Sequence, residues 1–177
     1  MIITLLGYMG SGKSIIGSDL ALKLGYGFLD LDDYIERKEG STISDIFSEK
    51  GEIYFRRIES EYLRELLDNK KSIVLALGGG TPCYGSNMER LLSCEHVITI
   101  YLKAVPETLV KRLEDEPDKR PLITHLSNRD DLMEFVSKHL FERSVFYNQA
   151  SLTLITDHKP VDTLVEEIVL RLFQNSP

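Results

Sequence analysis

Short apolar runs alternate with amphipathic segments along the whole chain. Each run is bounded by glycine, aspartate or a charged cluster, and between the runs apolar residues recur at helical spacing. The runs predict five strands, at Ile2–Leu6, Gly27–Asp30, Ser72–Leu77, Val97–Leu102 and Leu152–Thr156. Strands that alternate with helices are typical of a parallel sheet wrapped by helices. We therefore predict an α/β fold with one five-stranded parallel sheet.

Two helical stripes are clear, one after the first predicted strand and one near the C-terminus. They consist of Ile16, Leu20 and Leu24, and of Leu164, Ile168 and Leu172. Such stripes face a core, so we assign them to packing. Helix starts are indicated by capping-box spacing in Ser86–Glu89 and by Pro160 before the last stripe.

One charged segment interrupts this pattern. Glu114–Pro121 contains two prolines and lies between two helical segments. It is either a solvated surface loop or a lid over an active site. We treat residues 114–126 as a lid within one domain that covers residues 1–177.

Composition limits the class of protein. With 177 residues, 42% hydrophobic and 28% charged, the chain matches one ordinary globular domain, and a net charge of −7 argues against binding nucleic acid or an anionic membrane. Cys83 and Cys94 form no CxxC pair, and the four histidines lie at no metal-ligand spacing from them. The apolar N-terminus has no basic leader and is too short to span a membrane. We expect reduced thiols, no structural metal and a cytoplasmic location.

The strongest motif follows the first predicted strand. Gly7–Ser14 matches G-x-x-x-x-G-K-[ST] and opens a helical segment, as a phosphate-binding loop requires. Its glycines let backbone N–H groups turn toward phosphate, Lys13 can reach the β- and γ-phosphates, and Ser14 offers a hydroxyl to Mg²⁺. The alternative is a glycine turn with a surface lysine. The motif alone does not separate a kinase from a GTPase or a motor.

Acidic residues follow the second predicted strand. If the chain stays extended there, Asp30 and Asp32 face the same side. One carboxylate could then orient metal-bound water while the other takes the proton of an acceptor hydroxyl. Equally, the cluster could simply cap the next helix, since aspartate is a favoured N-cap residue. Asp157 is a rival acid after the last predicted strand.

Three arginines are candidates for recognising a carboxylate. Arg56 and Arg57 lie off the apolar stripe of their segment, so the spacing does not show which of them faces a site, and Arg143 lies much later. Arginine binds carboxylate through two parallel hydrogen bonds. Any one of these residues is more often a surface charge on a polar helix.

Together these motifs resemble those of shikimate kinases, in order and along almost the whole chain. The matching pieces are Gly7–Ser14, Phe28–Asp32, Ile43–Phe47, Gly51–Glu52, Phe55–Glu59, Gly78–Gly80, Arg120–Leu122 and Arg143. The resemblance implies a P-loop kinase fold with a mobile lid. It also implies ATP and Mg²⁺ as cofactors and shikimate as the small-molecule partner, phosphorylated on its 3-hydroxyl on the chorismate route to aromatic amino acids. We further expect a monomer.

The resemblance also implies roles for individual residues. Those implied to bind the nucleotide are Gly10, Ser11, Gly12, Lys13, Ser14, Ile15, Arg112 and Arg120. Those implied to bind shikimate are Asp32, Arg56, Gly78, Gly79, Gly80 and Arg143. Lys13, Asp32 and Arg120 would be catalytic, with Asp32 as the base, and Ser14 and Asp30 would hold the metal. Two departures, Asp157–Lys159 after the last strand and Leu77 before the glycines, put some adenine contacts and one polar contact in doubt.

Two other functions compete with this interpretation. Gluconate kinase has a similar fold and also begins with a phosphate loop, but the acid pair with Arg56 and the three glycines favours shikimate. A regulatory nucleotide-binding module without catalysis would be expected to lack the base or the lid arginine, and Asp32 and Arg120 are both present.

Overall fold

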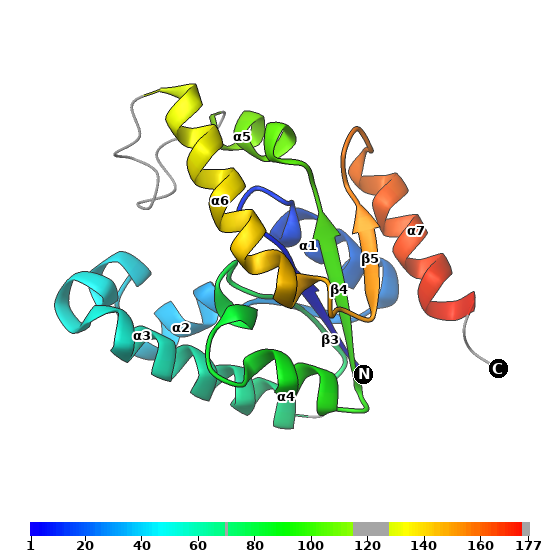
Figure 1. Ribbon diagram of the computed structural model, residues 1–177. Helices are drawn as coiled ribbons and strands as arrows, with labels where there is room; N and C mark the ends of the chain where they lie inside the picture. Colours follow the sequence, from blue (N-terminus) through cyan, green and yellow to red (C-terminus); the bar gives the residue numbers. More distant parts are fainter. Residues whose placement is uncertain (70, 115–127, 175–177) are drawn as a thin grey trace.

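The computed structural model describes residues 1–69, 71–114 and 128–174, and in this part of the chain five parallel strands form one sheet (Figure 1). The strand order across the sheet is β2-β3-β1-β4-β5. The strands are β1 (Ile2–Leu6), β2 (Gly27–Asp30), β3 (Ile73–Ala76), β4 (Val97–Lys103) and β5 (Leu152–Ile155). The predicted α/β sheet is confirmed, with strand ends that differ by at most one residue.

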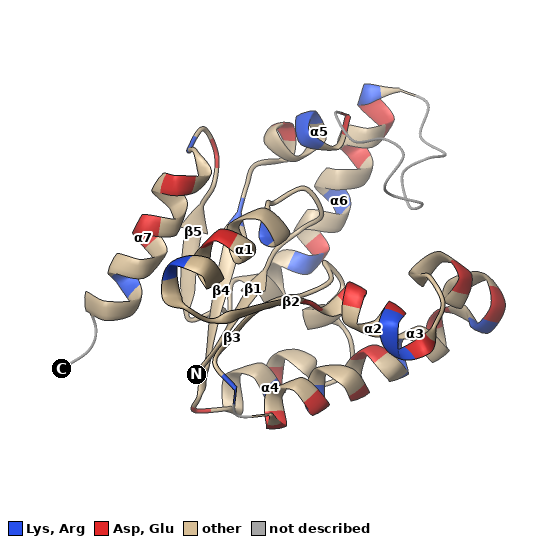
Figure 2. Cartoon of the chain, turned by 180° about the vertical axis from the view of Figure 1, so that it is seen from behind, with Lys and Arg blue, Asp and Glu red and all other residues tan. Residues whose placement is uncertain are grey.

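Seven α-helices and one 3₁₀ turn, η1 (Thr81–Cys83), connect and cover these strands in the described ranges. The helices are α1 (Lys13–Leu24), α2 (Leu31–Glu39), α3 (Ile43–Asp68), α4 (Asn87–Ser93), α5 (Pro106–Glu114), α6 (Arg129–Tyr147) and α7 (Val161–Gln174). Seen from behind in Figure 2, acidic and basic residues are interspersed along the outer helices, so the net charge is not gathered on one element.

Two apolar layers, one on each face of the sheet, hold the helices. Alternate residues of β1 enter different layers: Ile3 and Leu5 pack with α1 and α7, whereas Ile2 and Leu6 join the layer formed with the other helices. The predicted stripes are confirmed as core residues. Ile16, Leu20, Leu164 and Ile168 are fully buried, and Leu24 and Leu172 pack against them partly exposed.

The parallel sheet brings three strand ends to one edge. Register pairs Leu5 of β1 with Ala76 of β3, and Asp30 of β2 with the same Ala76. The phosphate loop, the acid cluster and the three glycines each follow one of these strands. They therefore meet at the carboxyl edge of the sheet, where α/β proteins bind their ligands.

The predicted capping box at Ser86 is wrong in detail. Helix α4 does begin at Asn87, but the Ser86 side chain makes no capping hydrogen bond. Gly85 precedes it with φ 54°, and Ser86 itself has φ −103° and ψ 24°, which is not the extended conformation of an N-cap residue.

Helices α5 and α6 flank the charged segment as predicted. Helix α5 ends at Glu114, and α6 has Asn128 as its N-cap, whose side chain accepts from the backbone N–H of Asp131. The lid prediction for residues 114–126 falls outside the described residues apart from Glu114. No helix among those described is long and apolar enough to cross a membrane.

Candidate active site

The phosphate loop follows a backbone path that demands glycine. Gly7, Gly10 and Gly12 have φ of 146°, 79° and 94°, a region that other residues rarely adopt. A Cβ on Gly7 would also lie 2.7 Å from the Leu102 carbonyl oxygen. Gly12 is the N-cap of α1, so the loop leads directly into the positive end of that helix.

Lys13 and Ser14 begin α1 and face the loop and the acid cluster. The Lys13 ammonium donates to the carbonyl oxygens of Gly7 and Tyr8, at 2.8 and 3.0 Å. The Ser14 hydroxyl donates to Oδ2 of Asp30 at 2.9 Å. A hydroxyl and a carboxylate oxygen at this separation are hard ligands of the kind that Mg²⁺ takes, so the residues fit the metal expected here.

Asp30 and Asp32 are not arranged as the extended pair that the sequence predicts. Asp30 is the N-cap of α2, and its Oδ1 accepts from the backbone N–H of Asp32 at 3.0 Å. The extended geometry is wrong because Leu31 already begins the helix. Asp30 thus does both things left open by the sequence: it caps α2 through one oxygen and meets Ser14 through the other.

Asp32 lies in a setting that opposes its negative charge. Burial, followed by repulsion from Asp30 and Glu59, raises its pKa from 3.8 to about 7, although Lys13 acts in the opposite direction. A carboxylate that titrates near neutral pH can accept a proton from a substrate hydroxyl. Asp32 therefore has the chemistry of a general base.

The raised pKa of Asp32 predicts a cost in stability at neutral and alkaline pH. Because folding raises this pKa, its contribution is most favourable below the unfolded value near 4 and is lost as the pH rises through 7. We expect Asp32→Asn to increase the free energy of unfolding at pH 8 by about 2 to 4 kcal/mol, with the gain vanishing toward pH 4. Urea unfolding of the ligand-free protein at several pH values measures this, and a gain that grows toward acid pH would contradict it.

The three glycines after β3 lie against the other candidate residues. A Cβ on Gly78 would be 3.0 Å from Oδ1 of Asp32, and one on Gly80 would be 3.0 Å from Nη1 of Arg56. The segment therefore approaches both side chains so closely that larger residues would displace them.

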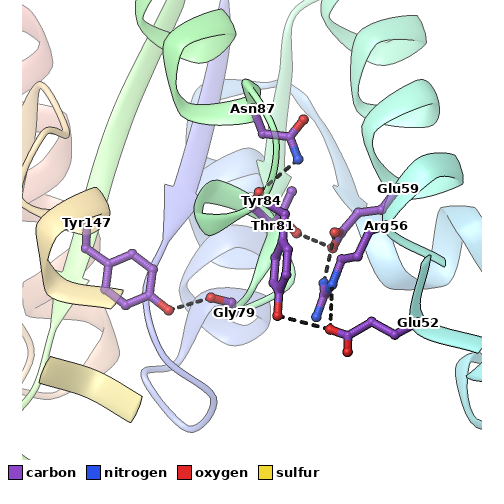
Figure 3. Close-up of polar contacts among 8 residues, drawn as sticks. All are labelled: Glu52, Arg56, Glu59, Gly79, Thr81, Tyr84, Asn87 and Tyr147. Atoms are coloured by element: carbon purple, nitrogen blue, oxygen red, sulfur yellow. Dashed lines mark hydrogen bonds and ion pairs between the residues drawn. The ribbon is translucent and has the colours of Figure 1, made fainter. Parts of the chain in front are cut away.

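Gly79 lies between the phosphate loop and α6. A Cβ there would lie 3.5 Å from the Met9 backbone nitrogen and 3.6 Å from Nη1 of Arg143. Tyr147, also on α6, donates its hydroxyl to the Gly79 carbonyl at 2.5 Å (Figure 3). The guanidinium carbon of Arg143 lies 5.4 Å from the centre of the Tyr8 ring. Arg143 is thus held beside the loop.

The structure distinguishes Arg56 from Arg57. The Arg56 side chain is 19% exposed, and its Nη1 donates to Oε2 of Glu59 at 2.9 Å. The Arg57 side chain is 63% exposed and forms a loose 3.7 Å pair with Glu61. Of the two arginines, Arg56 is the one that borders the glycines, so Arg56 is the candidate for the site.

The sequence predicts no role for Glu59, yet the structure places it among the candidate residues. It is 1% exposed, and its Oε1 accepts from the Thr81 hydroxyl at 2.6 Å while its Oε2 holds Arg56 (Figure 3). Its position three residues after Arg56 on a helix was the available signal, because such pairs are neighbours. Glu59 fixes Arg56 and contributes to the raised pKa of Asp32.

The remaining predicted nucleotide residues lie around the loop. Nη1 of Arg112 donates to the Gly10 carbonyl at 3.1 Å and its Nη2 to the Thr156 carbonyl at 3.2 Å. This places Arg112 between the loop and the end of β5. Ser11 is buried, whereas Ile15 is 61% exposed.

Two further candidates stand apart. Asp157, the rival acid, accepts from the backbone N–H of Val105 at 3.1 Å, which ties the end of β5 to the start of α5 and not to the acid pair. Arg120 lies outside the described residues, and its role stays a prediction.

Comparison with known proteins shows the family of this chain. The family model described as shikimate kinase matches residues 9–173. A shikimate kinase of Flavobacterium psychrophilum is 47% identical over 97% of this chain and 98% of its own length. The crystal structure of shikimate kinase from Bacteroides thetaiotaomicron has a TM-score of 0.89 at 33% identity, over 98% of both chains. That of shikimate kinase from Acinetobacter baumannii in complex with shikimate has a TM-score of 0.86 at 35% identity, over 99% of this chain and 94% of that one.

Proposed function

The chain belongs to the shikimate kinase family, and from this premise we propose that Asp32, Lys13 and two arginines carry out its reaction. That reaction is the Mg²⁺-dependent transfer of the γ-phosphate of ATP to the 3-hydroxyl of shikimate, giving shikimate 3-phosphate and ADP. The observation that carries the assignment of residues is the position of Asp32. Its backbone N–H donates to Asp30, which itself contacts Ser14, and its Oδ1 borders Gly78.

Asp32 acts as the general base. With a pKa near 7, its carboxylate is ionised in a useful fraction of molecules at neutral pH and still basic enough to take the proton of the 3-hydroxyl. The nearby negative charges of Asp30 and Glu59 favour that proton transfer, since they make Asp32 more basic.

The nucleotide lies along the phosphate loop. Backbone groups of Gly10, Ser11, Gly12 and Ile15 surround the phosphates, and Lys13 neutralises charge that develops on the transferred group. Ser14 and Asp30 would hold Mg²⁺, Asp30 through water, and the bound ion would neutralise negative charge on the phosphate oxygens. Arg112 borders the adenine side.

Arg56 and Arg143 bind the carboxylate of shikimate, and the ring lies against the Gly78–Gly80 segment. The glycines support this assignment because their lack of side chains leaves the guanidinium groups accessible from the loop. Since both arginines come from long helices, α3 and α6, their positions are set by rigid elements.

Changing either arginine to lysine is expected to weaken shikimate binding by about tenfold, because lysine keeps the charge and loses the forked geometry. The measurement is a titration of each variant with shikimate and with its carboxamide analogue. Wild-type protein should prefer the acid strongly. Equal affinity of the wild type for acid and amide would show that these residues do not form a carboxylate clamp.

The function itself is tested by coupled ADP release with shikimate, with gluconate and with no acceptor. Turnover with shikimate alone is expected. Turnover with gluconate but not with shikimate would indicate a gluconate kinase. ATP binding without turnover on either acceptor would indicate a regulatory module.

We also propose that the whole chain works as one kinase domain and as a monomer. One five-stranded sheet runs through the described residues, which supports the single domain. The free thiols of Cys83 and Cys94 support the expected cytoplasmic location. Arg120 is proposed to stabilise the transferred phosphoryl group from the predicted lid.

A further inference from the structure

Tyr84 lies directly under the guanidinium group of Arg56. It follows η1, four residues after Gly80, and the Arg56 guanidinium carbon is 3.9 Å from the centre of its ring (Figure 3). The other aromatic rings near that carbon, those of Phe55 and Phe47, are farther away at 5.1 and 5.9 Å. At 3.9 Å the planar guanidinium gains both cation–π attraction and close packing from the Tyr84 ring.

A shared carboxylate links Tyr84 to Arg56 a second time. Oε1 of Glu52 accepts from the Tyr84 hydroxyl at 3.0 Å and from Nε of Arg56 at 3.4 Å. Glu52 follows Gly51, which interrupts the helical conformation of α3 with φ 79° and ψ 171°. The break sets the start of the second part of α3, one turn before Arg56.

Arg56 is thus fixed on three sides. Glu52 holds Nε, Glu59 holds Nη1 and Tyr84 covers one face of the plane. Nη2 makes no hydrogen bond within the described part of the chain, and Gly80 borders it without a side chain. The edge formed by Nη1 and Nη2 is therefore the part of the group left for a ligand.

We propose that Tyr84 is a positioning residue that sets the specificity of the shikimate site for a planar carboxylate. By fixing the plane of Arg56, it presents the free edge in the one orientation that makes two parallel hydrogen bonds to a ring-borne carboxylate. The inference rests on the proposed role of Arg56 and adds a residue that itself touches no reacting atom.

The test compares Tyr84→Leu with Tyr84→Phe. We expect Tyr84→Leu to raise KM for shikimate about tenfold, with kcat and KM for ATP changed less than about twofold, because only the orientation of Arg56 is lost. Tyr84→Phe keeps the stacked ring and loses only the hydroxyl contact with Glu52, so its KM should stay within about threefold of wild type. The preference for shikimate over its carboxamide should fall in the leucine variant and persist in the phenylalanine variant.

Tyr54, which lies on α3 with Arg56, provides a matched control. Its ring lies 5.0 Å from the guanidinium carbon of Arg57, the exposed neighbour outside the site. Tyr54→Leu removes the same kind of contact and should leave KM for shikimate and the acid-over-amide preference unchanged. A drop in melting temperature without these kinetic changes would be its expected effect.

An unchanged KM and preference in folded Tyr84→Leu would overturn the inference, as would an equal loss with acid and amide. If Tyr84→Leu does not fold, Tyr84→Met takes its place, since methionine adapts to irregular space and also removes the stacked ring. Normal KM and preference in that variant would then reject the inference. Failure of the wild-type enzyme to phosphorylate shikimate would instead reject the proposed function.

Discussion

Asp32→Asn is expected to lower kcat with shikimate by about 10²-fold or more, because asparagine has nearly the same shape and cannot accept the hydroxyl proton. The pKa of Asp32 adds a second expectation. In the wild type, kcat/KM for shikimate should rise with pH through a value near 7 as the carboxylate ionises, and this rise should be absent in the variant. Steady-state kinetics between pH 5.5 and pH 9 measure both effects.

Two neighbouring acids make good controls for Asp32. Asp33 is exposed on the same turn of α2, and Asp33→Asn should leave kcat and its pH dependence nearly unchanged. Asp30→Asn should reduce the response to Mg²⁺, since Asp30 contacts the Ser14 hydroxyl. If Asp30→Asn gave the shikimate-specific loss and Asp32→Asn gave none, the roles of the two carboxylates would be reversed.

The parts that sequence predicts best are those determined locally. The phosphate loop is a contiguous motif, and the strand and helix periods reflect which residues face the two apolar layers. For this reason the five strands and the stripes of α1 and α7 agree closely with the structure. The edge where the site forms also follows from local order, because parallel strands place their following loops together.

What the sequence leaves undecided depends on contacts between distant segments. Arg56 and Arg57 have the same local setting, and Arg56 is selected because Glu59, Glu52, Tyr84 and Gly80 surround it. The contact between Glu59 and Thr81 spans 22 residues of sequence, and that between Tyr147 and Gly79 spans 68. Periodicity carries no information on such pairs.

The aspartate pair illustrates a different limit. Asp30 and Asp32 are two residues apart, so an extended chain would place them on one side, but the tendency of aspartate to cap a helix competes with that geometry. Here α2 begins at Leu31, and Asp30 adopts the capping geometry. The two carboxylates still influence each other, because the first turn of α2 folds Asp32 back over Asp30.

Lys13→Ala should have the largest effect of any single change, a loss of about 10³-fold in kcat, because a positive charge aimed at the transferred phosphoryl group is removed. The fold should tolerate the change. Lys13 is the first residue of α1, where a positive charge opposes the helix dipole, and its ammonium donates to the carbonyl oxygens of Gly7 and Tyr8. Circular dichroism and the melting temperature check that the variant is folded.

The electrostatic link between Lys13 and Asp32 separates this role from simple loss of nucleotide binding. Lys13 lowers the pKa of Asp32. Lys13→Ala should therefore move the rise of the remaining kcat/KM with pH to higher pH, whatever the size of the rate loss. Lys23→Ala is the matched control, since Lys23 lies on the same helix and pairs with Glu166 at the surface, and both kcat and the pH profile should stay normal. Near-normal kcat in folded Lys13→Ala would reject the role in transfer. A large loss with an unshifted pH profile would mean that Lys13 acts on the phosphate without acting on the base.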